Sequence, residues 1–121
     1  MTAMPVPVGV FIVDDSVQLT EILSELISDP GIVEVVGSAD SVGQAVIDIA
    51  RLRPDVIILD LQLKDGDGFE VATAVRASPD TRDSAIVFFT NHLSPEFRRR
   101  AAELGADLYL DKSKDHDQIV G

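Results

Sequence analysis

The side chains best suited to chemistry are aspartates that stand directly after short apolar runs. Val56 to Leu59 is followed by Asp60, and Val8 to Val13 is followed by Asp14 and Asp15. Unbroken apolar runs of this length are typical of strands buried on both faces of a parallel sheet. In open α/β sheets, ligands bind beyond the carboxyl ends of such strands. The spacing therefore predicts that the three carboxylates meet in one crevice at the edge of a sheet.

Three neighbouring carboxylates favour the binding of a hard divalent cation. Left alone they repel one another and raise each other's pKa, and Mg²⁺ relieves the repulsion because it takes oxygen ligands. Lys112 follows a short apolar run at 108–110, and Thr90 follows another at 85–89, so both are expected at the same edge. An ammonium and a hydroxyl group suit the oxygens of a phosphoryl group. These residue types together predict a site for Mg²⁺ and a phosphoryl group.

Strands and helices must alternate along the chain to bring these residues together. Strands are predicted at 8–13, 32–36, 55–59, 85–89 and 108–110, with helices near 19–27, 42–50, 69–77 and 95–104 between them. This alternation is typical of an α/β protein with a parallel sheet. Right-handed crossovers and two central apolar strands favour one flavodoxin-like, doubly wound domain with strand order 2-1-3-4-5 and helices on both faces.

Local signals predict where some of the helices begin. Asp14 or Asp15 could cap the first helix as well as bind a metal, and Ser41-x-x-Gln44 resembles a capping box. A last helix can use only Ser113 to Gly121, which is short, so part of one sheet face and the flank of the first helix are expected to be exposed. A homodimer or an output domain outside this sequence is expected to cover that surface.

Length and composition limit the class of protein. The 121 residues fit one domain, with 1–7 as a lead-in and 8–121 as the folded part. A net charge of −11 opposes direct binding to nucleic acid or to an anionic membrane. The chain has no cysteine, no apolar run long enough to span a bilayer, and no start that resembles a signal peptide. We therefore expect a cytoplasmic location.

With these residues the chain resembles a known family, the receiver domains of two-component response regulators, of which the chemotaxis regulators are examples. The resemblance covers nearly the whole chain. It rests on an acidic pair after the first strand, an aspartate after the third, a hydroxyl residue after the fourth, and a lysine after the fifth with an aromatic residue three positions before it. The matching residues are Asp14, Asp15, Asp60, Thr90, Lys112 and Tyr109.

The resemblance implies a role for each of these residues. Asp60 would be the phosphoacceptor, and the family pattern implies that Asp15, Asp60 and the backbone carbonyl of Gln62 bind Mg²⁺ directly while Asp14 does so through water. Lys112 and Thr90 would contact the phosphoryl oxygens, and Thr90 and Tyr109 would form the conformational switch. The donor would be a sensor histidine kinase, a histidine phosphotransfer protein or a small acyl phosphate. Such a domain is a signalling acceptor with slow self-dephosphorylation rather than an enzyme.

Some positions depart from the family pattern. The proline that usually follows the lysine is Ser113 here, so the geometry of that peptide bond is open. Asn91 replaces the usual small residue and would narrow access to the phosphoryl group, and Lys64 stands where many members have proline. Gln62 and His92 occupy the two positions that tune dephosphorylation in this family.

Two other functions are alternatives for this chain, a phosphatase and an interaction module. A small acid phosphatase could use Asp60 as its nucleophile, but such enzymes usually carry a second acid two residues later, where this chain has Gln62. An interaction module that works without phosphorylation would not need the complete acidic set. Asp60 could also simply cap a loop, a role that would leave the other acids and the lysine unexplained.

Overall fold

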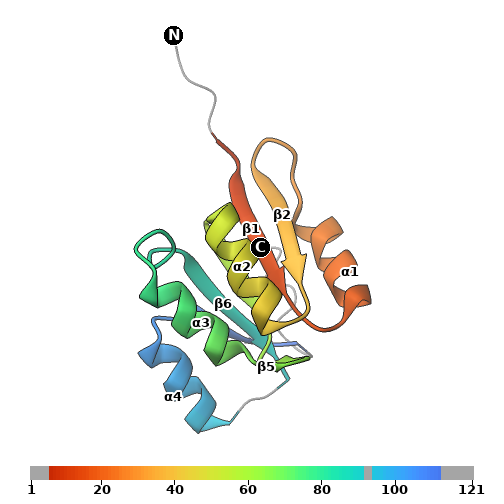
Figure 1. The fold of residues 1–121 in the computed structure, drawn as a ribbon. Coiled ribbons are helices and arrows are strands. Elements are labelled where there is room, and N and C mark those ends of the chain that lie inside the picture. The colour runs from red at the N-terminus through yellow and green to blue at the C-terminus, as the bar shows by residue number, and fades with distance from the viewer. Residues whose placement is uncertain (1–5, 92–93, 113–121) are drawn as a thin grey trace.

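A computed structural model describes residues 6–91 and 94–112 of the chain. Apart from two short strands, β4 and β5, its strands and helices alternate along the chain (Figure 1). In chain order they are β1 (Val8–Val13), α1 (Val17–Ile27), β2 (Val33–Ala39), α2 (Val42–Leu52), β3 (Val56–Leu59), β4 (Gln62–Leu63), β5 (Gly66–Asp67), α3 (Gly68–Ala77), β6 (Ala85–Thr90), α4 (Pro95–Glu103) and β7 (Leu108–Asp111). None of the helices within the described ranges is long and apolar enough to cross a membrane.

The main sheet has five parallel strands in the order β2-β1-β3-β6-β7. Since β4 and β5 form a separate hairpin, β6 and β7 are the fourth and fifth strands of this sheet, and the predicted order 2-1-3-4-5 is confirmed. Val13 of β1 lies opposite Leu59 of β3, so these two strands end at the same level. The residues that follow them, Asp14 and Asp60, therefore leave the sheet side by side.

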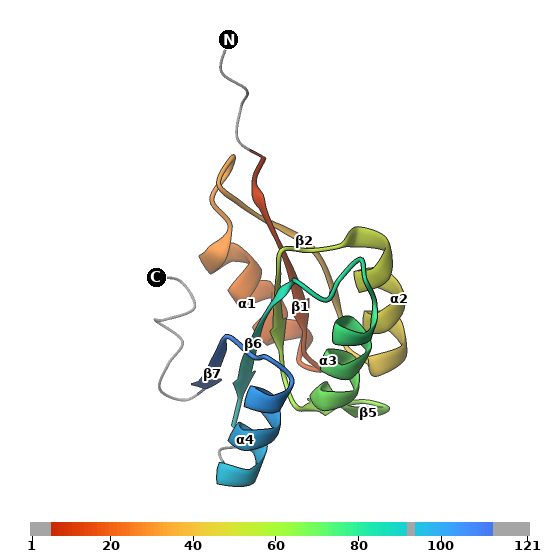
Figure 2. The same ribbon diagram turned by 90° about the vertical axis from the view of Figure 1, so that its left-hand side faces the viewer.

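The two faces of the sheet carry different helices. Figure 2 shows α1 on one side and α2 and α3 on the other, and Ala101 of α4 belongs to the same core cluster as the buried residues of α2 and α3. Side chains of β1 point alternately to the two faces of the sheet. Phe11 and Val13 belong to that cluster, and Val10 and Ile12 belong to the cluster beneath α1. This alternation explains why the strands are apolar without interruption.

The predicted exposure of apolar surface on the α1 side of the sheet is confirmed only in part. Most strand residues on that face are buried, and Leu23 of α1 packs against them together with the partly buried Leu19 and Ile27. Leu108, at the start of the edge strand β7, is 48% exposed. Ile22 and Leu26 of α1 are also exposed, which agrees with the predicted exposure of part of that helix. The predicted last helix lies outside the described residues.

Each helix begins at a side-chain cap. The hydroxyl of Ser16, rather than a carboxylate of Asp14 or Asp15, accepts a hydrogen bond from the Leu19 amide, so the prediction of an aspartate cap was wrong. Ser41 caps α2 by accepting from the Gln44 amide, as expected, but the Gln44 side chain donates to Asp48 instead of closing a capping box. The acids after β1 are thus left free of the capping role.

Two parts of the fold differ from the sequence prediction. β2 lies at the edge of the sheet, as expected, but runs to Ala39 rather than ending at 36. Between β3 and α3 the chain forms the two-residue strands of the β4–β5 hairpin, which is too short to leave a periodic pattern. Both differences place additional polar residues at the carboxyl edge of the sheet, next to the acids.

Candidate functional site

The three predicted acids form one cluster at the carboxyl ends of β1 and β3. One carboxylate oxygen from each of Asp14, Asp15 and Asp60 lies within 4.8 Å of the other two. Asp14 and Asp60 are only 4% and 6% exposed, whereas Asp15 is open to solvent. Oxygen donors gathered at this spacing fit a hard cation such as Mg²⁺, which binds through a few carboxylates and keeps several waters.

Lys112 joins the two buried acids from the end of β7. Its Nζ lies 2.7 Å from Oδ2 of Asp14 and 2.8 Å from Oδ2 of Asp60, and its side chain is 15% exposed. Burial opposes the charged ammonium, but the hydrogen bonds to Asp14 and Asp60 outweigh it, so the pKa of Lys112 is raised. Burial also raises the pKa of Asp14, although the bond from Lys112 acts against this. The lysine therefore neutralises much of the repulsion that the sequence predicts.

Backbone amides fix the orientation of both buried carboxylates. The Leu61 amide donates to Oδ1 of Asp60 at 2.7 Å, and the Ser16 amide donates to Oδ1 of Asp14 at 2.9 Å. The Asp60 amide donates to the Val13 carbonyl at 2.9 Å, which ties the residue to the end of β1. Both carboxylates are thus held in place before any ligand arrives, which lowers the entropy cost of binding one.

Gly68, which the sequence analysis missed, allows the backbone at Asp60 to take this position. The Gly68 amide donates to the Leu61 carbonyl at 2.9 Å. A Cβ atom on Gly68 would stand 2.2 Å from the carbonyl oxygen of Asp60, far inside van der Waals contact. The first residue of α3 must therefore lack a side chain for the helix to start against the phosphoacceptor candidate.

Thr90 and Tyr109 lie on the neighbouring strands. Thr90 is fully buried at the end of β6, and its carbonyl accepts a hydrogen bond from the Lys112 amide at 3.1 Å. The half-buried Tyr109 ring packs 5.9 Å from the Phe88 ring, with the Arg98 guanidinium 5.0 Å from its centroid. Burial raises the pKa of Tyr109. The ring is thus held between the β6 core and a cation of α4.

The residues predicted to tune the site are spread over its rim. Gln62 is exposed on β4, two residues after Asp60, and Asn91 is exposed directly after β6. His92 and the Lys112–Ser113 peptide bond lie outside the described residues. The rim next to Asp60 therefore carries one exposed polar side chain on the β4–β5 hairpin and another directly after β6.

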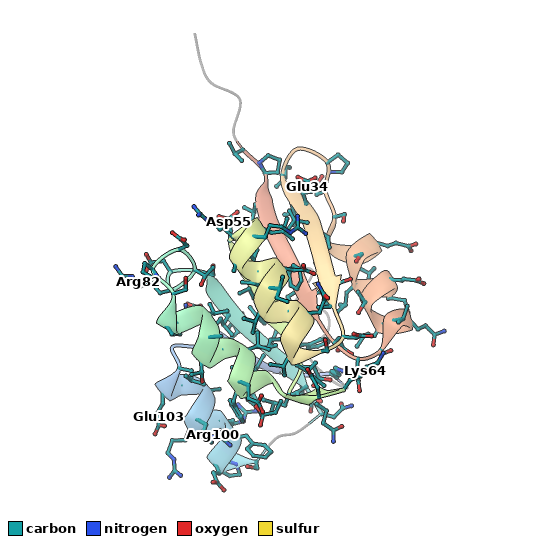
Figure 3. All side chains as sticks on the ribbon, in the orientation of Figure 1. Glu34, Asp55, Lys64, Arg82, Arg100 and Glu103 are labelled. Carbon is teal, nitrogen blue, oxygen red and sulfur yellow. The ribbon has the colours of Figure 1, made fainter. Side chains whose placement is uncertain are left out.

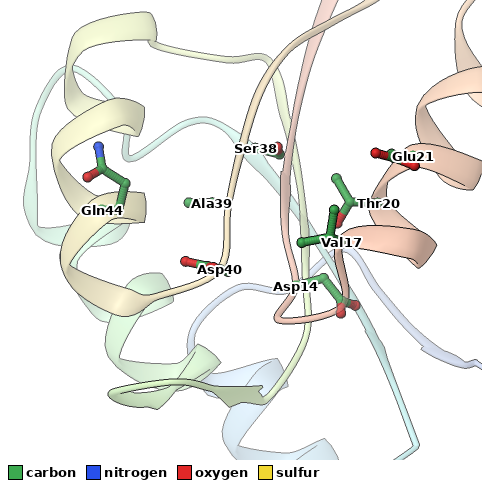
Figure 4. Close-up of a pocket in the computed structure, with 8 residues that line it drawn as sticks. All are labelled: Asp14, Val17, Thr20, Glu21, Ser38, Ala39, Asp40 and Gln44. Carbon is green, nitrogen blue, oxygen red and sulfur yellow. The ribbon is translucent and has the colours of Figure 1, made fainter.

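A cavity of about 370 Å³ opens beside Asp14, between α1, the end of β2 and α2 (Figure 4). Polar groups from all three elements face it, including the side chains of Glu21, Asp40 and Gln44. Its lining comprises Asp14, Val17, Thr20, Glu21, Ser38, Ala39, Asp40 and Gln44. The buried acid therefore has an open approach whose wall carries the acidic side chains of Glu21 and Asp40.

The β4–β5 hairpin closes the other side of the rim. Asp65, between its strands, accepts hydrogen bonds from the Val42 amide at 2.6 Å and the Gly43 amide at 3.1 Å. These bonds at the amino terminus of α2 lower the pKa of Asp65. The loop that follows Asp60 is thus anchored to α2.

Comparison with known proteins identifies the same kind of domain. Residues 10–121 match the family described as the response regulator receiver domain. The sensory transduction protein LytT of Bacillus cereus is 34% identical over 111 residues, which cover 92% of this chain and 44% of that protein. A protein-glutamate methylesterase/protein-glutamine glutaminase of Syntrophus aciditrophicus is 38% identical over 117 residues, covering 91% of this chain and 33% of that protein.

A solved structure shares the fold closely. The signal receiver domain of the putative response regulator NarL from Mycobacterium tuberculosis superimposes with a TM-score of 0.84 at 32% identity, covering 96% of this chain and 92% of that one. The chain spans half or less of the length of the curated relatives described above.

Proposed function

Because this chain belongs to the response regulator receiver domain family of two-component systems, we propose that Asp60 accepts a phosphoryl group and thereby switches the binding of a partner. The observation that supports this best is the buried Asp60 carboxylate, held by the Leu61 amide and the Lys112 ammonium beside two further acids. A carboxylate with one fixed orientation beside a cation is suited to attack on phosphorus.

The transfer exchanges one bond to phosphorus for another. An oxygen of Asp60 attacks the phosphorus atom, and the P–N bond of a phosphohistidine breaks, or the P–O bond of an acyl phosphate. The electron pair of the broken bond leaves with the imidazole, which takes up a proton, or with the carboxylate product. Lys112, whose raised pKa keeps it charged at neutral pH, pairs with the negative oxygens that the phosphoryl group brings to Asp60.

Asp15, Asp60 and the backbone carbonyl of Gln62 would hold Mg²⁺, with Asp14 acting through water. Asp14 already accepts hydrogen bonds on both oxygens, from Ser16 and Lys112, whereas Asp15 makes neither a hydrogen bond nor an ion pair among residues 6–91 and 94–112. When bound, Mg²⁺ would neutralise charge that develops on the phosphoryl oxygens.

The signal would pass through β6 and β7. Thr90 would turn toward the phosphoryl oxygens, and the Tyr109 ring would move inward behind it. Because Arg98 stacks on that ring in the present conformation, the movement would break a cation–π contact and change the surface of α4.

Membership of the family supports a proposal for the partners. The phosphoryl donor would be a sensor histidine kinase or a histidine phosphotransfer protein, in the cytoplasm. Because the curated relatives extend well beyond the matched region, an output domain or a second copy of the chain would receive the signal.

Incubation with acetyl phosphate and Mg²⁺, followed by intact-mass analysis, tests the proposed function. We expect the mass to increase by a single phosphoryl group and the donor to be consumed in proportion to the protein. Continuous hydrolysis of several phosphate esters would support the phosphatase instead, and an unchanged mass under every donor tested would leave only an interaction module.

The exposed Asp15 and the buried Asp14 should contribute differently to Mg²⁺ binding. We expect Asp15→Asn to weaken Mg²⁺ binding by about tenfold, because it removes the charge of a carboxylate that has no other partner among the residues the structure describes. Asp14→Asn should have a smaller effect. Isothermal titration of Mg²⁺ into both variants measures this, and a larger loss for Asp14→Asn would reverse the assigned roles.

A further inference from the structure

Lys64 stands on the rim of the acidic site, in the turn between β4 and β5. Its Nζ lies 2.6 Å from Oδ2 of Asp40, and its backbone amide donates to the Asp40 carbonyl at 3.3 Å. Asp40 lines the same cavity as Asp14 (Figure 4). In Figure 3, Lys64 lies well below Asp55 and Glu34, toward the edge of the sheet at which β1 and β3 end. A cation is thus paired with a residue that lines the cavity beside Asp14.

Two anchors hold this cation in place. The neighbouring Asp65 binds the amino terminus of α2 through Val42 and Gly43, so the turn cannot swing away freely. The pKa of Lys64 is raised chiefly by its hydrogen bond with Asp40, then by the charge of Asp40, and further by the charge of Asp15. The ion pair with Asp40 is the second anchor, and it holds the ammonium beside a residue that lines the same cavity as Asp14.

We propose that Lys64 determines how tightly the site holds its ligands, by weakening divalent-cation binding and favouring the anionic phosphoryl donor. This inference rests on the proposed function of the site. A positive charge on the rim repels Mg²⁺ and attracts a phosphate dianion, and both effects weaken with salt. Lys64 would therefore keep the acidic cluster from being saturated with cation, and would help to bring a negatively charged donor to a chain of net charge −11.

The expected effects of Lys64 on Mg²⁺ binding and on labelling have opposite signs. They therefore distinguish a role of its charge from a purely structural role. If Lys64 only supported the hairpin, its removal would loosen the loop that carries Gln62 and would weaken the binding of both ligands. If its charge acts on the site, Lys64→Met tightens Mg²⁺ binding and slows labelling by acetyl phosphate. Lys64→Arg keeps the charge and should behave as the wild type does.

Arg53 offers a matched control. It forms an exposed ion pair with Asp80 at 3.3 Å, and the side chains are 62% and 58% exposed, compared with 64% and 38% for Lys64 and Asp40. Arg53 is the C-cap of α2 and precedes β3, so it lies at the far end of the sheet from the acids. Arg53→Met therefore removes the same net charge without touching the rim.

The experiment is calorimetric titration of Mg²⁺ into the four proteins, with the initial rate of labelling by subsaturating acetyl phosphate as a second measurement. At an ionic strength of about 0.01 M we expect Lys64→Met to bind Mg²⁺ roughly three- to tenfold more tightly than the wild type, and the difference to shrink at about 0.15 M. When Mg²⁺ is saturating, acetyl phosphate should label Lys64→Met more slowly than it labels the wild type. Arg53→Met and Lys64→Arg should match the wild type in both measurements.

Other outcomes overturn the inference in distinguishable ways. A wild-type protein that binds no Mg²⁺ would contradict the proposed function itself. If the wild type binds Mg²⁺ normally and Lys64→Met binds it equally well or more weakly, the role of Lys64 is refuted. The proposed function of the site would then still stand. An equal gain in Arg53→Met would show that net charge, and not the position of Lys64, sets the affinity.

Discussion

Asp60→Asn is expected to abolish phosphorylation by acetyl phosphate while the fold stays intact. The amide oxygen can still accept the hydrogen bond that the Leu61 amide donates to Oδ1 of Asp60, but an amide is a poor nucleophile. The substitution removes one partner of Lys112 and also relieves repulsion with Asp14, and these two effects on stability oppose each other. Intact mass measures labelling, and thermal unfolding followed by circular dichroism measures the fold.

Asp80→Asn provides the control for this experiment. Asp80 is an exposed partner of Arg53 and has no contact with the acidic cluster. Asp80→Asn changes the net charge by the same amount as Asp60→Asn does. It should leave labelling at the wild-type level. Equal labelling of Asp60→Asn and the wild-type protein would exclude Asp60 as the acceptor.

Gly68→Ala should damage both stability and phosphorylation. The new Cβ would stand 2.2 Å from the Asp60 carbonyl oxygen, and because the obstacle is backbone, either β3 or the start of α3 must move. We expect a loss of about 3 kcal/mol in the free energy of unfolding, at the upper end of the usual cost of overpacking. The same shift moves the Asp60 carboxylate away from Lys112, so labelling should slow markedly. Urea unfolding and the rate of labelling measure the two effects.

Gly43→Ala is the matched control, since Gly43 also lies in the first turn of a helix. A Cβ there would meet only an oxygen of Asp65, at an ordinary 3.6 Å. Replacing a helical glycine by alanine commonly stabilises a helix by up to about 1 kcal/mol. If Gly68→Ala were as stable and as active as Gly43→Ala, the proximity of α3 to Asp60 would not matter for function.

The arrangement of the central residues could be predicted because each follows a strand with a strong apolar signal. The runs before Asp14, Asp60 and Thr90 are buried on both faces, and parallel strands bring their carboxyl ends to one edge. Once the strand order was predicted, the proximity of Asp14 and Asp60 followed from topology. The ion pairs from Lys112 to both acids add a fact that topology alone does not give.

The supporting residues could not be predicted because they depend on tertiary approach. Nothing local marks Gly68 as a point where a helix meets a strand end, since the clash appears only when α3 is docked. The contacts of Lys64 and Asp65 join segments more than 20 residues apart, through a hairpin too short for periodicity. Ser16 was overlooked because the acids before it are equally good caps by residue type.

The most direct test of the central claim is to locate the phosphoryl group. The protein would be labelled with acetyl phosphate and Mg²⁺ and then reduced with borohydride, which converts an aspartyl phosphate to homoserine. Peptide mapping by tandem mass spectrometry would then identify the modified position. The proposed function predicts homoserine at position 60 and nowhere else. Modification at Asp14 or Asp15, or a phosphoryl group on a side chain that borohydride does not reduce, would contradict it.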